Sequence, residues 1–379
     1  QPPPRPSYPE AGTKKDHLIK RLEHAQRRGH LPLMRAHVGP YLPDRLEALT
    51  LMERWMKTLA QGGFLDIVSV GSSQLTQSHF GEDWTGLPNG GGVPIQRADE
   101  FLRVWNAARP MLMRAYSGTT RVPQKAQVLE ESINCAWHAL SLWWFSQLDG
   151  RGPLDVLSNL TEHMTALRTI AGHGKPAETN IPHHFAFRGT DDVGYLVSGY
   201  LGARTAKACG VRHYVLQNMM SVPKQIFGLP DLIRARALLT LVRELEDGRF
   251  KVLYQPRAGL DFFSPDTTRA MGQLAAVTAL MADVEPPVID GLVPKAGAVV
   301  GARPQIGASL VDAGAGIGRE EDIELLLDGR LLIAEYDPDA DRIHGMLLDD
   351  LAPGPHSLLL KVRDKSGNVA EARSDFEVR

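Results

Sequence analysis

The chain has 379 residues, of which 43% are hydrophobic and 23% are charged, and its formal net charge is -2. This composition excludes disorder as the overall state, and the absence of a basic excess argues against a nucleic-acid or anionic-membrane partner. The two cysteines are too few for a disulfide scaffold or a Cys-rich metal site, and no uninterrupted apolar run reaches the roughly 20 residues of a membrane span.

The length allows two or three domains. Residues 1–13 are rich in proline, and we expect them to form an extended arm. From residue 14, helical and strand patterns alternate. Helices are predicted over 14–29, 45–63, 98–109, 122–131, 154–171, 192–209, 229–246 and 266–283. Strands are predicted over 31–38, 65–71, 110–116, 132–137, 179–187, 212–218 and 250–256.

This alternation of strands and helices predicts an α/β domain built on a parallel sheet. So many βα units in one run favour a (β/α)8-type, TIM-like barrel over residues 14–284, with 14–29 covering its N-terminal end. An open doubly wound sheet is the alternative. No GxGxxG follows the first strand and no GxxxxGK[ST] occurs, which weakens the nucleotide-binding versions of such a sheet.

The predicted barrel lacks an eighth strand. The segment that follows, VEPPVIDGLVP, contains Pro286, Pro287 and Pro294, and proline is excluded from central strands. We therefore expect a linker over 285–295 and an incomplete barrel, whose opening is covered by the C-terminal module, the N-terminal arm or, as we favour, a partner chain.

From residue 296 to 379 the pattern becomes all-β. The run 303–314 alternates, 322–336 predicts a hairpin around Asp328-Gly329, and 356–378 predicts a second pair of strands. Short strands separated by turns over about ninety residues predict a β-sandwich of the immunoglobulin-like kind.

Functional residues of such barrels lie at the C-terminal ends of the strands and in the loops that follow. Arg35 and Arg114 lie in otherwise apolar strands, and arginine suits the binding of an anion. The predicted substrate-binding residues, all at strand ends, are Arg35, Ser73, Arg114, Gln217 and Gln255. We expect Arg35, Arg114, Tyr116, Gln217 and Gln255 to meet at one mouth of the barrel.

No metal site is predicted. His183 and His184 are adjacent in a predicted strand, where their side chains would point to opposite faces and not reach one ion. Cys135 and Cys209 are interpreted as small buried hydrophobes. The aromatic run 143–145 is interpreted mainly as core, with a stacking wall against a planar ligand as the alternative.

The segment from GHLPLMRAHVGPYLPDRLEALTL to VSVGSSQLTQSHFGED (29–83), and the segments 187–245 and 252–284, carry a resemblance to a known family. Over about residues 14–284 the chain resembles the barrel (epsilon) subunit of coenzyme B12-dependent glutamate (methylaspartate) mutase. The resemblance implies a barrel whose mouth faces a corrin and a radical rearrangement of a small acid. It also implies an arginine cluster for substrate carboxylates, with Arg35 at its first position and Arg114 or Tyr116 near its third.

The chain departs from that family at several positions. The family's catalytic glutamate is replaced by His138 or a neighbour, so His138 and Tyr116 are the catalytic residues that the resemblance implies. The cobalamin-binding Asp-x-His-x-x-Gly is absent from the sequence, so adenosylcobalamin would have to come from a separate B12-binding subunit. The family's second arginine position falls on Thr76 or a neighbour, so the arginine cluster that the resemblance implies is incomplete, and glutamate itself is an unexpected substrate.

Two leading functions follow from these observations, and an unrelated barrel lyase or hydrolase is a third option. The first is the barrel subunit of a cobalamin-dependent carbon-skeleton mutase that acts on a small carboxylate other than glutamate. The second is a non-catalytic, mutase-like barrel that serves as a binding or assembly subunit, with the proline-rich arm and the sandwich contacting other chains. A B12 enzyme would be cytoplasmic, whereas an immunoglobulin-like module with a removed leader would place the chain in the periplasm or outside the cell.

Overall fold

The computed structural model describes residues 8–28, 32–223, 226–312, 316–317, 320–365 and 368–379. It divides into two compact units, residues 1–262 and 263–379. The predicted end of the barrel, residue 284, lies inside the second unit, after helix α10 (Thr267–Ala282). The first seven residues of the predicted arm lie outside the described part of the chain.

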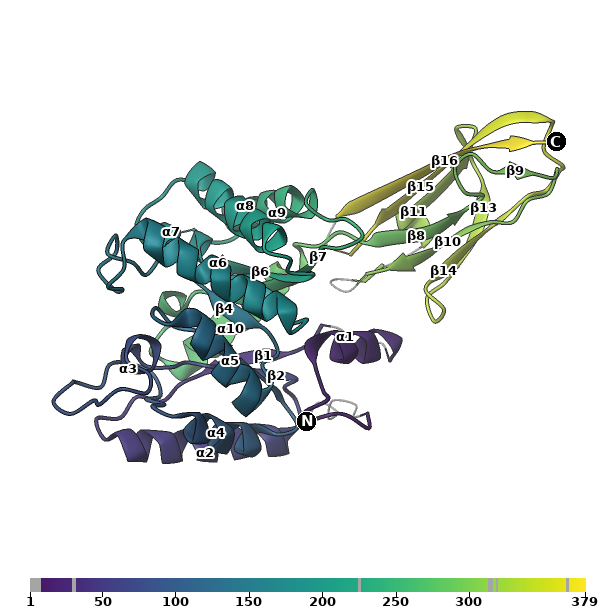
Figure 1. Ribbon diagram of the computed structural model, residues 1–379. Coiled ribbons are helices and arrows are strands. Elements are labelled where there is room, and N and C mark those ends of the chain that lie inside the picture. The colour runs from purple at the N-terminus through teal and green to yellow at the C-terminus, as the bar shows by residue number, and fades with distance from the viewer. Residues whose placement is uncertain (1–7, 29–31, 224–225, 313–315, 318–319, 366–367) are drawn as a thin grey trace. The chain divides into compact units, whose positions relative to one another are not determined.

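The first unit is built on one parallel sheet of seven strands that lie side by side in chain order (Figure 1). The strands are β1 (Arg35–Val38), β2 (Ile67–Val70), β3 (Leu112–Tyr116), β4 (His138–Leu140), β5 (Ala177–Thr179), β6 (His213–Met220) and β7 (Lys251–Ala258). A doubly wound sheet would reverse its strand order, so this order favours the barrel type. The side chain of Arg35 on β1 contacts that of Gln255 on β7, which shows that the sheet curls toward closure.

The connecting helices form the outer layer of this unit (Figure 1). They are α2 (Arg45–Gly62), α4 (Ala98–Ala108), α5 (Val122–Ile133), α6 (Val156–Gly172), α8 (Asp192–Ala208) and α9 (Leu229–Arg243). Their apolar faces are buried against the sheet; Met52 of α2 and Val104 of α4, for example, share a core with Val68 and Met113. Two short helices, α3 (Gln74–Ser78) and α7 (Pro182–Ala186), follow β2 and β5.

Helix α1 (Leu18–Arg27) lies at the N-terminal ends of the strands, as the sequence predicts. Leu18 packs with Ile67 and Leu112, which begin β2 and β3. The guanidinium of Arg21 donates to the backbone carbonyls of Asp66 and Pro110, just before those strands, at 2.7 and 2.8 Å. The opposite, C-terminal ends of the strands are therefore the ones that can carry a site.

Two predicted strands are wrong in their bounds. The strand expected over 132–137 is found at His138–Leu140, because Asn134 with φ of 49° ends α5 and the chain needs the following residues to reach the sheet. The strand expected over 179–187 occupies only Ala177–Thr179, and Pro182 then begins α7, since proline fits the first turn of a helix.

The second unit consists of α10 and two antiparallel-type sheets. The strands are β8 (Val288–Val293), β9 (Val299–Val300), β10 (Ile306–Val311), β11 (Ile323–Leu327), β12 (Arg330–Leu331), β13 (Ile333–Asp337), β14 (Arg342–Met346), β15 (Gly354–Arg363) and β16 (Val369–Val378). One sheet has the order β13-β14-β10-β8 and the other β12-β11-β15-β16-β9, in which β9 alone pairs in parallel. Side chains from both sheets, such as Leu310 and Leu360, share one core.

Both predicted hairpins of this unit are present. Leu327 pairs with Arg330 around Asp328-Gly329, where both turn residues have positive φ, and β15 pairs with β16 along its whole length. The predicted linker 285–295, however, contains a strand, β8, which pairs with β10. Pro287 and Pro294 flank β8 without entering it, so the prolines that argued against a strand mark its two ends.

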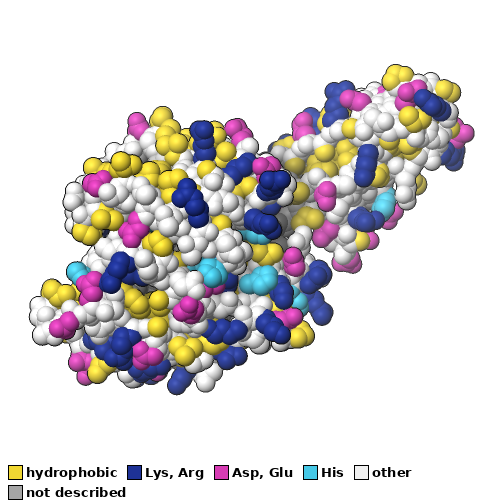
Figure 2. All heavy atoms as spheres, in the orientation of Figure 1, with side chains coloured by type: hydrophobic (Ala, Val, Ile, Leu, Met, Phe, Trp, Pro, Cys, Tyr) yellow, Lys and Arg dark blue, Asp and Glu magenta, His cyan; other side chains and the backbone are white. Residues whose placement is uncertain are grey.

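In the part of the chain that the structure describes, no helix is both long and apolar enough to cross a lipid bilayer. On the face shown in Figure 2, basic and acidic side chains are interspersed, in keeping with 42 lysines and arginines against 44 aspartates and glutamates. A cluster of like charges in the interior would therefore differ from the mixed charges of this surface.

Candidate functional site: an arginine cluster at the strand ends

The register of the sheet places a set of polar side chains on its inner face. Residues side by side in neighbouring strands share a face, as do alternate residues of one strand. The pairs Ser69 with Arg114, and Gln217 with Gln255, are in register. Together with Glu178 on β5, these residues form a polar layer beyond the apolar layer that α1 covers.

Three arginines from different strands meet in this layer, and we call Arg35, Arg114 and Arg257, with Glu178, the arginine cluster. Arg35 donates through Nε to Ser69 Oγ at 2.6 Å and through Nη1 to Gln255 Oε1 at 3.3 Å. Arg114 donates through Nη2 to Glu178 Oε1 at 2.6 Å, and both of these side chains are almost fully buried.

The other oxygen of Glu178 accepts a hydrogen bond from the indole nitrogen of Trp137. The ring of Trp137 in turn lies beneath the guanidinium of Arg35, 5.8 Å from ring centroid to Cζ. Trp137 is therefore the floor of the cluster, and it fixes both the carboxylate and one arginine.

The cluster carries more positive than negative charge. Burial, together with the charges of Arg114 and Arg257, holds the pKa of Arg35 well below its ordinary value. Burial first and Arg114 second lower the pKa of Arg257 to about 10. Both shifts mean that the guanidiniums repel one another and that Glu178 alone does not offset their charge. An anion placed among them would relieve this repulsion.

Several buried polar atoms of the inner face have no hydrogen-bond partner among the described residues. They include Nη2 of Arg35, Nε of Arg114 and Oε1 of Gln217. Buried polar groups are almost always paired, so a group of unpaired ones in one place indicates a bound molecule or ordered water. Arg35, Gln255 and Arg257 are partly buried residues, although Nη2 of Arg35 is itself buried.

A wall of aromatic rings lies beside the cluster. His183 accepts from Gln217 Nε2 through Nδ1 at 3.4 Å, and its ring lies 4.3 Å from that of His184. His184 stacks on Trp144 at 12° and contacts Phe145. The two histidines are close because they lie on a helical turn, so the expectation that they point to opposite faces of a strand is wrong.

Both histidines of this wall are uncharged at neutral pH. Burial, followed by the charges of His184 and Arg257, holds the pKa of His183 well below its ordinary value. Burial, followed by Arg151 and Arg257, lowers the pKa of His184 to about 3. A neutral imidazole has one ring nitrogen that accepts a hydrogen bond, which agrees with donation from Gln217 to His183.

Strained backbone is concentrated in the loops at this end of the sheet. Leu142 and Phe145 after β4, and Ser221 after β6, have φ of 50°, 53° and 61°. Such conformations are costly for residues other than glycine and persist only where surrounding contacts enforce them. Asn159 provides one such contact, since its amide donates to the carbonyls of Leu142 and Trp144. Strain of this kind is common at binding and catalytic sites.

His138, which the family resemblance implies as catalytic, lies on the other face of the sheet. It pairs in register with Ala115 and Ala177, whereas its neighbour Ala139 is in register with Glu178. Nε2 of His138 donates to Glu130 of α5 at 2.8 Å, and Nδ1 lies 3.3 Å from Ser117 Oγ. The predicted catalytic position is therefore not part of the arginine cluster, because the strand begins at His138 rather than ending there.

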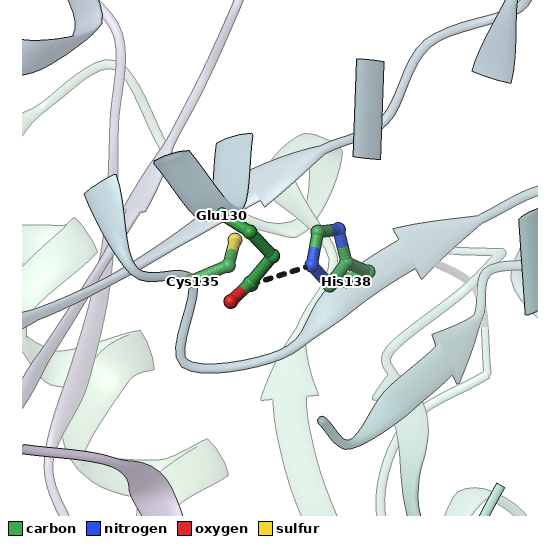
Figure 3. A group of neighbouring side chains, drawn as sticks. All are labelled: Glu130, Cys135 and His138. Carbon is green, nitrogen blue, oxygen red and sulfur yellow. Dashed lines mark hydrogen bonds and ion pairs between the residues drawn. The ribbon is translucent and has the colours of Figure 1, made fainter. Parts of the chain in front are cut away.

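His138 belongs instead to a buried group with Glu130 and Cys135 (Figure 3). Burial alone would raise the pKa of Glu130, but the hydrogen bond from His138 and the charge of Lys175 leave that pKa lowered. Burial raises the pKa of the Cys135 thiol to about 12, and the thiol donates to a backbone carbonyl. Ligand atoms of the three residues lie within 4.8 Å of one another, so the group could hold a metal ion, but it is already joined by its own contacts.

Of the other predicted residues, Tyr116 lies on the same face as Arg114, and its ring meets Phe145 edge-on at 5.7 Å. Burial raises the pKa of the Tyr116 hydroxyl above its ordinary value. Ser73 is fully buried and caps α3, with its hydroxyl accepting from the backbone nitrogen of Thr76 at 3.3 Å. The structure thus brings Arg35, Arg114, Tyr116, Gln217 and Gln255 together, and it gives Ser73 a local structural contact.

Sequence reasoning missed the carboxylate of the cluster. Glu178 lies one residue before the strand predicted there, so it was not a strand-end candidate. The sequence feature that could have identified Glu178 is its position as the one charged residue in the run PAETNIP. Arg257 and Trp137 lie at strand ends, but nothing in their local sequence indicates that they meet Arg35.

No protein-family model and no curated protein matches the chain. Among solved structures, the chain is similar to a 2,3-dimethylmalate lyase of the PEP mutase/isocitrate lyase superfamily, with 14% identity, a TM-score of 0.32, and coverage of 64% of this chain and 72% of the lyase. For a spore coat polysaccharide biosynthesis protein from Bacillus subtilis, the identity is 11% and the TM-score 0.34, and the match covers 66% of this chain and 68% of that protein. For CopC from Methylosinus trichosporium OB3b, the identity is 19% and the TM-score 0.21, and the match covers 24% of this chain and 92% of CopC. These scores are too low to bear on the function of this chain.

Proposed function

We propose that the chain binds a small carboxylate anion in the arginine cluster. The observation that carries the proposal is the imbalance of three guanidiniums against one buried carboxylate, with donor nitrogens of Arg35 and Arg114 left unpaired. Guanidinium donors match the two oxygens of a carboxylate in geometry and charge, and the partly buried setting strengthens the contact.

The role of the bound carboxylate is best explained by the second of the two expected functions, a binding subunit of a larger assembly. Glu178 is already paired with Arg114 and Trp137, so it is not free to act as a base. His138 lies on the opposite face of the sheet. A mutase role on a small carboxylate other than glutamate is the second candidate, favoured by the position of the arginines at the C-terminal strand ends.

Adenosylcobalamin would supply radical chemistry to the mutase candidate, but this chain has no Asp-x-His-x-x-Gly with which to hold it. The residues present do not fit the cofactor, so we derive no step through it. We expect a titration of the pure chain with hydroxocobalamin to show no stoichiometric binding, because only a separate B12-binding subunit would bring the cofactor. Tight one-to-one binding would contradict this.

The carboxylate proposal is tested by calorimetric titration of the full chain with succinate at low salt. We expect Arg257→Met to weaken binding by about 10- to 100-fold, since a hydrogen bond to a charged group contributes roughly 1.5–3 kcal/mol. Arg204→Met is the matched control, because Arg204 is exposed on α8. Equal affinity of the wild-type chain and Arg257→Met, or no binding of succinate and other small carboxylates, would refute the proposal.

A further inference from the structure

The arginine cluster is lined by acceptors as well as donors. Oε1 of Gln217 and Oδ1 of Asn180 are unpaired among the described residues, and these side chains are 1% and 7% exposed. Gln217 lies on the inner face beside Gln255, and Asn180 is the first residue after β5, two positions beyond Glu178. The Gln217 amide therefore faces the region where the anion is proposed to bind, and the Asn180 amide lies at the C-terminal end of the strand that carries Glu178.

The amide of Gln217 is turned with its nitrogen toward His183. Its Nε2 is 3.4 Å from Nδ1 of His183, which is buried and uncharged and accepts the hydrogen bond. The carbonyl end of the amide is thus the end left without a partner. A buried acceptor without a donor costs roughly 1–3 kcal/mol, so the bound molecule is expected to satisfy it.

A carboxylate alone cannot do this, because an ionised carboxylate has no hydrogen to donate. A second group on the ligand that donates a hydrogen would satisfy these acceptors directly, without ordered water. An ammonium would donate, but it would bring a positive charge beside Arg35, Arg114 and Arg257, which already repel one another. A hydroxyl donates without charge, and it can also accept from the unpaired nitrogens.

We infer that the ligand of the arginine cluster is a small hydroxy carboxylate, whose carboxylate binds the guanidiniums and whose hydroxyl donates to Gln217 or Asn180. This inference rests on the proposed function and specifies its ligand class. It distinguishes hydroxy carboxylates from two other classes of ligand. Amino acids carry an ammonium group that the charge of the cluster disfavours, and simple carboxylates have no hydrogen to donate to the two amides.

Three probes of matched length test the inference: succinate, racemic malate and racemic aspartate, titrated into the full chain by calorimetry. They differ only in bearing hydrogen, hydroxyl or ammonium at one carbon. We expect malate to bind about tenfold more tightly than succinate, and aspartate more weakly than succinate. In Gln217→Leu, or in Asn180→Ala should that variant not fold, the ratio of malate to succinate affinity should fall toward one. Gln127→Leu, on the surface of α5, should keep the wild-type ratio.

The outcomes separate this inference from the proposed function. If none of the three binds, the carboxylate proposal itself fails. If succinate and malate bind equally, the carboxylate proposal stands, but the inference is overturned, since ordered water then satisfies the amides. If aspartate binds most tightly, the acceptors serve an ammonium, and the inference is overturned as well.

Discussion

Glu178 is the residue on which the arrangement of the arginine cluster depends. It is fully buried, it pairs with Arg114, and it accepts from Trp137. Removing one partner of a buried ion pair leaves the other charge uncompensated. The carboxylate of Glu178 thus offsets part of the repulsion among the three guanidiniums that folding brings together.

We predict that Glu178→Gln lowers the free energy of unfolding by about 3–5 kcal/mol, because it leaves the charge of Arg114 unpaired. It should also tighten succinate binding, because the net positive charge of the cluster rises. Urea unfolding with and without succinate measures both effects. A variant as stable as the wild type would show that Glu178 does not offset the charge of Arg114.

Buried histidines give the stability of the chain a pH dependence of definite sign. Burial lowers the pKa of His163 from 6.5 to about 4, and that of His183 falls well below 6.5. Between these values the unfolded chain binds protons that the folded chain does not. The contribution of these histidines to stability is therefore fully present above pH 6.5 and decreases as the pH falls below it.

We predict a decrease in the free energy of unfolding of up to about 1.4 kcal/mol per pH unit for each such histidine as the pH falls from 6.5 toward 4. Urea unfolding at several pH values measures the slope. His163→Gln should flatten it, whereas His173→Gln, exposed at the end of α6, should not. A slope unchanged by His163→Gln would mean that His163 is protonated in the folded chain.

At the scale of elements, the sequence predicts the helices best and the short strands worst. The amphipathic pattern and paired glycines of 45–63 predict α2 almost to the residue. β4 and β5 have three residues each, too few for a periodicity, and their bounds depend on the turn at Asn134 and on the helix that begins at Pro182. Such bounds are set by how the chain packs, which local pattern does not encode.

These misplaced bounds explain what was right and wrong about the candidate site. Arg35, Arg114, Gln217 and Gln255 come from strands whose C-terminal ends the sequence predicts to within about two residues, and these side chains lie together on the inner face. His138 and Glu178 come from the two misplaced strands. For this reason His138 was expected in the site and lies outside it, whereas Glu178 was not predicted and lies inside it. A shift of one residue in a strand moves a side chain to the opposite face.

At the scale of the whole molecule, the change from βα units to antiparallel sheets is the feature that the sequence predicts most surely. The hairpins of the second unit are marked by turn residues, and no strand of that unit pairs with the seven-stranded sheet among the described residues. The immunoglobulin-like character of the second unit and the partner that covers the open barrel remain predictions.

The sheet of the first unit has two edge strands, β1 and β7. Edge strands have backbone groups that no neighbouring strand pairs, so they open more readily than central strands. We predict that, in the isolated chain, amides of β1 and β7 exchange with solvent faster than those of β2 to β5. Hydrogen exchange followed by mass spectrometry measures this. Equal and strong protection of all seven strands would mean that both edges are covered within the chain itself.

The central claim is that the arginine cluster binds a carboxylate. The most direct test is a crystal structure of the full chain grown with malate. We predict density for one malate whose carboxylate accepts from Nη2 of Arg35 and Nε of Arg114 at about 2.7–2.9 Å. Well-ordered water in that place, or malate bound only elsewhere on the molecule, would contradict the account.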